Sequence, residues 1–383
     1  MQVALGAVYA WSVFRIPLTK AHGWTIPQVT LIFQVTIFIV GFAAFAGGAW
    51  MRRSGPRPVA VTAAILYGAG TVLAGTAGTR TMFYVYYGVI GGIGLGFGYI
   101  IPIATLVKWF PDRRGMITGV AVAGFGSGSL VTAPVATSLI ASVGVGRTFE
   151  ILGCGYFVVV LLCALFMRNP PAGYAPAGYQ AAAAAAKSAR HFTLSEALGT
   201  WQWYALWLTL FLNTTAGIAI ISQASPMAQE IAGVSAKTAA VLVSTIAIAN
   251  GCGRFLWASL SDAIGRRTVF LVMFLVQSAV FYLLASAHDF TLLTVYSCII
   301  LLCYGGGFGT MPAFTADYFG SAQIAPIYGA MVTAWGFAAA FGPTLVANIR
   351  EATGRYEGAL RWLALATLLS AALPLVLRPP KRQ

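Results

Sequence analysis

Charged residues are scarce in this chain of 383 residues, and their scarcity excludes most classes of protein. Asp, Glu, Lys and Arg make up 8% of the sequence, against about 25% in an ordinary soluble domain. Hydrophobic types make up 59%, and the mean hydropathy is +0.81. So few charges cannot cover a soluble body of this size in water. Soluble enzymes and nucleic-acid-binding proteins are therefore excluded, and the composition predicts a membrane protein.

Residues that build metal sites, disulfides and catalytic sites are also few and scattered. The sequence has five cysteines and three histidines, without Cys-x-x-Cys spacing or Cys/His pairing. It has no Walker lysine after a glycine-rich loop and no Ser/His/Asp set of the kind that hydrolases use. We therefore expect no metal, no cofactor and no enzymatic activity.

Acidic residues are the scarcer charged type, with nine Asp and Glu against 23 Lys and Arg and a net charge of +14. In a membrane protein this excess indicates Lys and Arg in cytoplasmic loops that face anionic lipid, with no nucleic-acid partner. Of the basic residues, 14 lie in the tail and in loops on the side of the central linker described below, and 7 lie in the opposite loops. The imbalance predicts that the linker and both termini are cytoplasmic, in a multi-pass protein of the cell inner (plasma) membrane.

Long apolar runs are what the sequence has in abundance. A membrane-spanning helix needs about 20 apolar residues, and long continuous runs, unlike the short alternating segments of barrel strands, predict an all-α protein. The runs form two sets of six, in residues 1–168 and 201–383, joined by a linker at 169–200 that is rich in Pro, Gly and Ala. No secretory signal is expected at the start, and the completeness of the N-terminus and of the alanine-rich linker is left open. The twelve runs are 1–20, 28–50, 59–78, 82–108, 116–142, 148–168, 203–225, 237–260, 268–287, 290–319, 325–349 and 357–377.

The two halves repeat each other at a nearly constant offset. Gly55 lies 210 positions before Gly265, and the Gly-x-x-x-Pro stretch at 98–102 lies 210 positions before the stretch that ends in Pro312. Such a repeat predicts two homologous six-helix bundles, as in many secondary transporters, with a substrate site near the bilayer midplane between them.

One loop of the second half carries a specific motif. Asp262, Gly265, Arg266 and Arg267 have the spacing Asp-x-x-Gly-Arg-Arg, and this loop resembles the cytoplasmic signature of the major facilitator superfamily. In the first half the Asp position is occupied by Arg52. The resemblance implies that these residues form a conformational element and not a substrate site.

Four longer stretches make the resemblance more specific. They are GAVYAWSVF at 6–14, KWFPDRRGMITG at 108–119, which contains Arg113 and Arg114, NGCGRFLWASLSDAIGRR at 250–267 and MPAFTADYFG at 311–320. Together they are similar to the oxalate/formate antiporter and monocarboxylate transporter branch of that superfamily. The resemblance covers all twelve runs and implies the major facilitator fold and transport by alternating access.

Once the 21 basic residues assigned to the loops and the tail are set aside, two remain inside apolar runs, Arg15 and Arg254. An arginine at the depth of Arg254 costs at least about 2.5 kcal/mol unless it faces a wet cavity or a partner. By the helix map, no Asp or Glu remains at the midplane to neutralise it, so an anionic substrate is its expected counter-ion, held in bidentate fashion. A structural ion pair with a misplaced carboxylate is the alternative. For Arg15, near Pro17 and Lys20, we prefer a side chain that snorkels to the outer interface, and an outer-gate role is the alternative.

The resemblance extends to other residues around the site. It implies that Arg254 binds the substrate carboxylate and that aromatic residues line the cavity. One helical turn before Arg254, where many monocarboxylate transporters have an Asp, this chain has Asn250, which can hydrogen-bond Arg254 or the substrate. Where oxalate transporters of the branch have a second cation, this chain has Trp335, and one cation suits one carboxylate. The sequence therefore favours a small monocarboxylate such as lactate or pyruvate, with an oxalate/formate-type anion exchanger as the alternative. The aromatic candidates are Tyr9, Tyr99, Phe125, Tyr304 and Phe308.

Proton coupling rests on the resemblance alone. It implies proton symport, and we expect a functional monomer in the lipid bilayer. Asp317, near the end of the tenth run, is the candidate proton site, with a structural cap as the alternative role.

Overall fold

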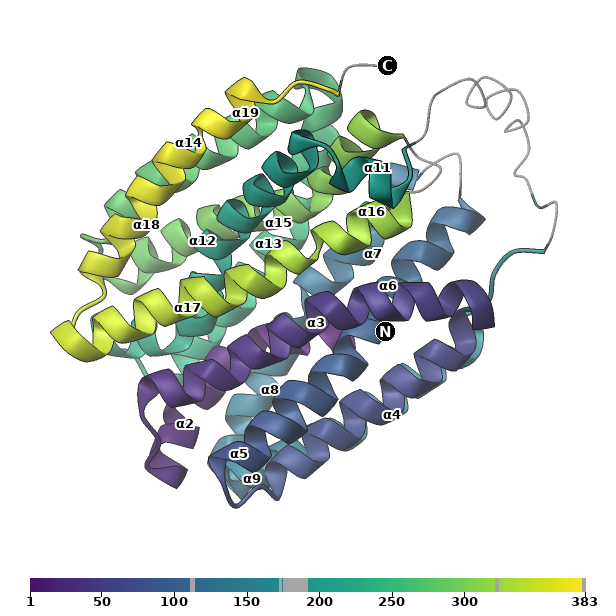
Figure 1. Ribbon diagram of the computed structural model, residues 1–383. Helices are drawn as coiled ribbons and strands as arrows, with labels where there is room; N and C mark the ends of the chain where they lie inside the picture. The colour runs from purple at the N-terminus through teal and green to yellow at the C-terminus, as the bar shows by residue number, and fades with distance from the viewer. Residues whose placement is uncertain (111–113, 172–173, 175–191, 321–323, 381–383) are drawn as a thin grey trace.

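A computed structural model describes residues 1–110, 114–171, 174, 192–320 and 324–380, and no strand occurs among them. Their helices form two groups that meet along a long seam, with the N-terminal half in purple to blue and the C-terminal half in teal to yellow (Figure 1). We call the side with the linker the linker side and the other the far side.

The described N-terminal half crosses between the two sides six times, and three of its crossings are built from consecutive shorter helices. Its elements are α1 (Gln2–Leu5), η1 (Gly6–Trp11), α2 (Ser12–His22), α3 (Ile26–Ser54), α4 (Pro56–Gly75), α5 (Arg80–Phe83), η2 (Tyr84–Gly91), α6 (Gly92–Trp109), α7 (Arg114–Gly126), α8 (Gly128–Val143) and α9 (Val145–Phe166).

The C-terminal half follows the same plan after a short helix at the end of the linker, α11 (Leu194–Leu198). Two of its crossings are interrupted, one between α16 and α17 and one between α18 and α19. The elements are α12 (Trp201–Ile231), α13 (Ala236–Ile264), α14 (Arg266–Leu284), α15 (Phe290–Phe319), α16 (Ile324–Met331), α17 (Thr333–Thr353), α18 (Glu357–Ser370) and α19 (Ala372–Val376).

Eleven helical stretches among the described residues are long and apolar enough to cross a membrane. They correspond to the second to twelfth predicted runs. The first predicted run is helical from Gln2 to His22, but η1 interrupts it, so none of its pieces alone reaches the length of a crossing. The all-α prediction is confirmed. Helix α12 continues past its predicted end at 225 to Ile231, which brings Glu230 into its last turn.

Polar caps explain where several crossings begin. Thr25 and Gln28 form a capping box at the start of α3, Ser235 accepts from the backbone N–H of Thr238 in α13 at 3.2 Å, and Asp289 caps α15. These side chains satisfy backbone donors that the first helical turn leaves without partners. The caps therefore fix helix starts that hydropathy locates only to within a few residues.

The internal repeat has a counterpart in the backbone. Gly55 has φ +79° between α3 and α4, and Gly265 has φ +87° between α13 and α14. Residues with a side chain rarely adopt this region, so glycine allows the same tight turn in each half. The 210-residue offset thus relates two equivalent turns.

Helices α3 and α17 lie side by side along the seam (Figure 1), and α8 packs against α13. Gln34 of α3 donates to the carbonyl of Ala340 at 2.8 Å, and Ser129 of α8 donates to the carbonyl of Val243 at 3.5 Å. Apart from contacts at the centre of the molecule, the hydrogen bonds that join the bundles within the described ranges lie in the far half. In this conformation, the far side is held closed.

Candidate functional site

Arg254 lies near the middle of α13 and is fully buried. Its Nε donates to Oδ1 of Asn250, one helical turn earlier, at 3.3 Å, and Asn250 donates to the carbonyl of Gly126 across the seam at 3.5 Å. Its two terminal nitrogens, Nη1 and Nη2, have no hydrogen-bond partner among the described residues. No ion pair within the described ranges includes Arg254. The guanidinium therefore carries two terminal nitrogens that make no well-formed hydrogen bond within the described residues, on a buried charge.

The predicted aromatic side chains surround this guanidinium. Its Cζ lies 4.9 Å from the ring centre of Phe308, a distance typical of a cation-π contact. Phe308 packs on Trp335, and Trp335 packs on Phe125, with ring centres 5.3 and 5.8 Å apart. Tyr99 lies 5.7 Å from Trp335 by the same measure. Residues from α6, α7, α13, α15 and α17 thus form one cluster at the seam.

Three tyrosine hydroxyls lie close to the cluster. The hydroxyls of Tyr9 and Tyr304 are 2.8 Å apart and join η1 to α15 across the seam. The hydroxyl of Tyr99 is buried and has no hydrogen-bond partner in the described chain. The hydroxyls of Tyr9 and Tyr99 lie near the Arg254 guanidinium and interact with it by charge and through contacts that fall short of a well-formed hydrogen bond. All eight residues expected at the site are therefore gathered in one place.

Tyr328 of α16 belongs to the same cluster, and the sequence reasoning missed it. It is 6% exposed and interacts electrostatically with Tyr99 and Arg254. It lies seven residues before Trp335, a spacing of two helical turns that puts both residues on one helical face. This spacing was the available signal.

Close helix packing holds Arg254 in place. A Cβ added at Gly309 of α15 would lie 2.1 Å from the carbonyl oxygen of Arg254, and one added at Gly253 would lie 2.0 Å from that of Leu302. Glycine at these positions lets α13 and α15 approach each other closely, as small residues do in membrane helices.

We therefore expect Gly309→Ala to lower the thermal unfolding temperature of the detergent-solubilised protein, because the added methyl group overpacks the interface. The expected cost is about 1–3 kcal/mol. Gly155→Ala in α9 is the matched control, since a Cβ there meets no atom within 4 Å. Equal unfolding temperatures for the two variants would contradict the close-packing argument.

The predicted conformational motif lies at the linker side, away from Arg254. Arg266 is 2.5 Å from Asp262 through Nη2 and 3.3 Å from Asp317 through Nε, while Gly265 forms the turn before it. Arg267 donates to the carbonyls of Pro374 and Leu375 at 2.8 and 2.6 Å. The second-half motif thus joins α13 to α14, α15 and α19.

The first-half arginines of the motif are not placed in this way. Arg113 lies outside the described residues, and although Arg114 begins α7, its side chain also lies outside them.

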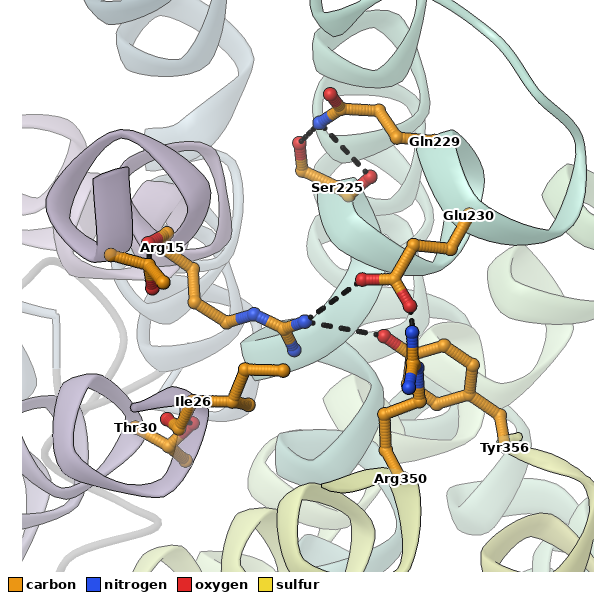
Figure 2. Close-up of polar contacts among 9 residues, drawn as sticks. Arg15, Ile26, Thr30, Ser225, Gln229, Glu230, Arg350 and Tyr356 are labelled. Carbon is orange, nitrogen blue, oxygen red and sulfur yellow. Dashed lines mark hydrogen bonds and ion pairs between the residues drawn. The ribbon is translucent and has the colours of Figure 1, made fainter. Parts of the chain in front are cut away.

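Arg15 does not snorkel to the surface, so that interpretation is wrong. It is 1% exposed, and its Nη2 lies 3.2 Å from Oε1 of Glu230 and 3.3 Å from the hydroxyl of Tyr356. Oε2 of Glu230 accepts from Arg350 Nε at 2.5 Å. Burial raises the pKa of Tyr356, so its hydroxyl stays neutral beside the carboxylate. Figure 2 shows Arg15 reaching across the seam to this group, and we call these four residues the far-side network.

The sequence reasoning missed this network because Glu230 was considered only as a partner for Arg254. The available signal was the repeat itself, because the first crossings of the two halves run in the same direction. Arg15 and Glu230 both lie near the far-side end of the first crossing of their halves.

Comparison with known families identifies the architecture. The family model described as Major Facilitator Superfamily matches residues 2–250 and 206–383. The chain belongs to this superfamily. It is accordingly a multi-pass membrane transporter with two homologous six-helix bundles, and not an enzyme.

Relatives within the superfamily narrow the branch. The oxalate:formate antiporter of Oxalobacter formigenes is 27% identical over 384 residues, which cover 98% of this chain and 90% of that protein. Monocarboxylate transporter 2 of Mus musculus is 24% identical over 394 residues, covering 93% and 78% respectively. The predicted resemblance to the oxalate/formate and monocarboxylate branch is thus confirmed.

Solved structures agree on the fold. The crystal structure of the D-xylose-proton symporter superposes with a TM-score of 0.73 at 16% sequence identity, and covers 99% of this chain and 97% of its own. At this identity the likeness shows the major facilitator fold alone.

Proposed function

We propose that this superfamily member is a secondary active transporter of small monocarboxylates of the lactate and pyruvate type, and that Arg254 binds the carboxylate. One observation carries the proposal. The terminal nitrogens of Arg254 are buried without a hydrogen-bond partner among the described residues, and a guanidinium in that state matches a carboxylate through two parallel hydrogen bonds. Relatives named for organic anions support the same substrate class.

The surrounding residues fit a small anion with an apolar part. Asn250 orients Arg254, and the free hydroxyl of Tyr99 can donate to the second carboxylate oxygen. The rings of Phe125, Phe308 and Trp335 bound the space beside them and suit a short alkyl group. Tyr9 and Tyr304 close the site across the seam. Recognition thus combines one charge pair with an aromatic enclosure.

An oxalate/formate-type anion exchanger is the second candidate, favoured by the relative of that name, which this chain matches over 98% of its length. Trp335 argues against it. A dicarboxylate would place its second charge near a buried indole, and an uncompensated buried charge costs several kcal/mol.

Transport is proposed to occur by alternating access of the two bundles, 1–168 and 201–383, about the central site, with 169–200 as a tether between them. The excess of Lys and Arg in the linker-side loops supports a cytoplasmic linker side and an external far side, in the plasma membrane. The motif around Arg266 then acts as a cytoplasmic conformational element. We further propose that the monomer is the transport unit.

Proton symport with the anion completes the proposal, because a carboxylate plus a proton moves no net charge against the membrane potential. In proteoliposomes, uptake of labelled lactate should rise as external pH falls below internal pH. With no carboxylate in contact with Arg254 among the described residues, the proton should travel with the substrate. Uptake without saturation or counterflow would indicate a channel instead.

Asp317 provides the control for this experiment. It is paired with Arg266 at the linker side, so Asp317→Asn should preserve the dependence on external pH. If Asp317→Asn retains lactate exchange but loses pH-driven accumulation, Asp317 carries the coupling and the substrate-borne proton is wrong.

A further inference from the structure

The far-side network joins the bundles through one buried charge. Arg15 belongs to the N-terminal bundle, whereas Glu230, Arg350 and Tyr356 all belong to the C-terminal bundle. Opening the external side separates the bundles here, so it must break both contacts of Arg15 (Figure 2).

Once the Arg15–Glu230 pair is broken, the two residues differ in the partners that they keep. Glu230 keeps Arg350, which lies 2.5 Å from it in the same bundle. Arg15 loses both Glu230 and Tyr356, and its Nη1 already has no hydrogen-bond partner in the described part of the chain. On opening, Arg15 is the charge that lacks a counter-ion.

Its own bundle offers no free carboxylate among the described residues. Residues 1–168 contain two acidic residues, Asp112 and Glu150. Glu150 is paired with Arg147 on α9. Asp112 lies outside the described residues, two positions in the sequence before α7 begins on the linker side. An arginine left unpaired between the two bundles attracts an anion from solution, because the low-dielectric protein around it focuses its field.

We infer that Arg15 is the first binding residue for the external anion, exchanging the Glu230 carboxylate for the carboxylate of the substrate when the outer side opens. This rests on the proposed function, which makes the substrate a carboxylate. The same exchange in reverse re-forms the pair with Glu230 once the anion moves inward to Arg254, and so favours closure behind it.

Unpartnered polar groups lie on the faces of the first crossing and of α12 that carry Arg15 and Glu230. Tyr9, Ser12 and Arg15 follow each other at intervals of three residues, so they lie along one side of the first crossing. Gln223 lies seven residues, or two helical turns, before Glu230, and therefore on the same face of α12. The hydroxyl of Ser12 and both amide atoms of Gln223 are buried and lack partners within the described ranges. They are suited to hydrogen-bond an anion that passes from Arg15 towards Arg254.

Two variants separate anion binding by Arg15 from its part in closing the outer side. Arg15→Gln and Glu230→Gln both break the ion pair, but only the first removes the cation. A cysteine at Ser129, which is 2% exposed at the seam, reports opening through labelling by a membrane-impermeant maleimide in a background without the five native cysteines. External KM is measured for labelled lactate and, in parallel, for labelled oxalate.

We expect both variants to label faster than the parent at Ser129→Cys. The external KM of Arg15→Gln should be about tenfold above that of Glu230→Gln, the loss expected for one hydrogen bond to a charged group. Arg15→Lys, which keeps the charge, should recover most of the difference. Arg80→Gln is the matched control, since Arg80 begins α5 on the same side and forms no ion pair among the described residues, and it should keep the parent KM.

Equal KM values for Arg15→Gln and Glu230→Gln would show that Arg15 acts only in closure, and unchanged labelling in both would show that the pair does not control opening. Either result overturns the inference. Failure of the parent to transport lactate while it transports oxalate would overturn the monocarboxylate proposal alone, because the comparison of variants then proceeds with oxalate.

Discussion

Replacing Arg254 by lysine is expected to lower the rate of lactate uptake at least about 100-fold, although lysine preserves the charge. The guanidinium presents two parallel donors to a carboxylate, whereas an ammonium is a point charge on a flexible stem. Asn250 and Phe308 hold the Arg254 plane at 3.3 Å and 4.9 Å, and a lysine has no planar group for these contacts to orient. A hydrogen bond to a charged group contributes about 1.5–3 kcal/mol, and an ammonium cannot reproduce the parallel pair of such bonds that the fork makes.

The measurement is uptake of labelled lactate into proteoliposomes, with elution volume and thermal unfolding in detergent as tests of folding. Arg254→Ala should be equally inactive. Arg361→Lys on the exposed side of α18 provides the matched control for the chemistry of the substitution and should transport normally. Parent-like uptake by Arg254→Lys would show that bidentate binding is not required, and uptake by Arg254→Ala would locate the site elsewhere.

Competition for uptake should show whether the site accepts one carboxylate or two. This is the second-largest effect that we expect. Lactate and pyruvate should inhibit uptake of labelled lactate, and oxalate and malonate should inhibit at least about tenfold more weakly. The reason is that Trp335, with its indole nitrogen buried and unpartnered among the described residues, offers no charge to a second carboxylate.

Propionate is the matched control for malonate, because both have three carbons and differ by one carboxylate. Strong inhibition by propionate with weak inhibition by malonate would assign the difference to charge. If oxalate inhibits better than lactate, the exchanger becomes the favoured function.

The membrane fold could be predicted from the sequence because the bilayer imposes a one-dimensional constraint. Each crossing needs about 20 apolar residues, so runs such as 290–319 reveal both the presence and the bounds of α15, which the structure gives as Phe290–Phe319. The first crossing was less predictable in detail, because the 3-10 turn η1 at Gly6–Trp11 leaves no mark in hydropathy.

The candidate site was predictable for a different reason. A buried arginine without a carboxylate in the same layer stands out in a sequence with only nine acidic residues, and resemblance supplied the aromatic positions around it. The structure brings all eight together, although their role in binding remains a prediction.

What only the tertiary structure decided is which charges meet. The sequence by itself determined the fold class, the repeat and the exceptional character of Arg254, because these depend on composition and on spacing along one chain. The partner of Arg15 lies 215 positions away in Glu230, and hydropathy carries no information about how two helices from different bundles are rotated towards each other. A lone arginine near a helix end looks the same in sequence whether it reaches for water or for a carboxylate across the seam. Packing of α2 against α12 makes that choice, because it buries the guanidinium where a counter-ion is required.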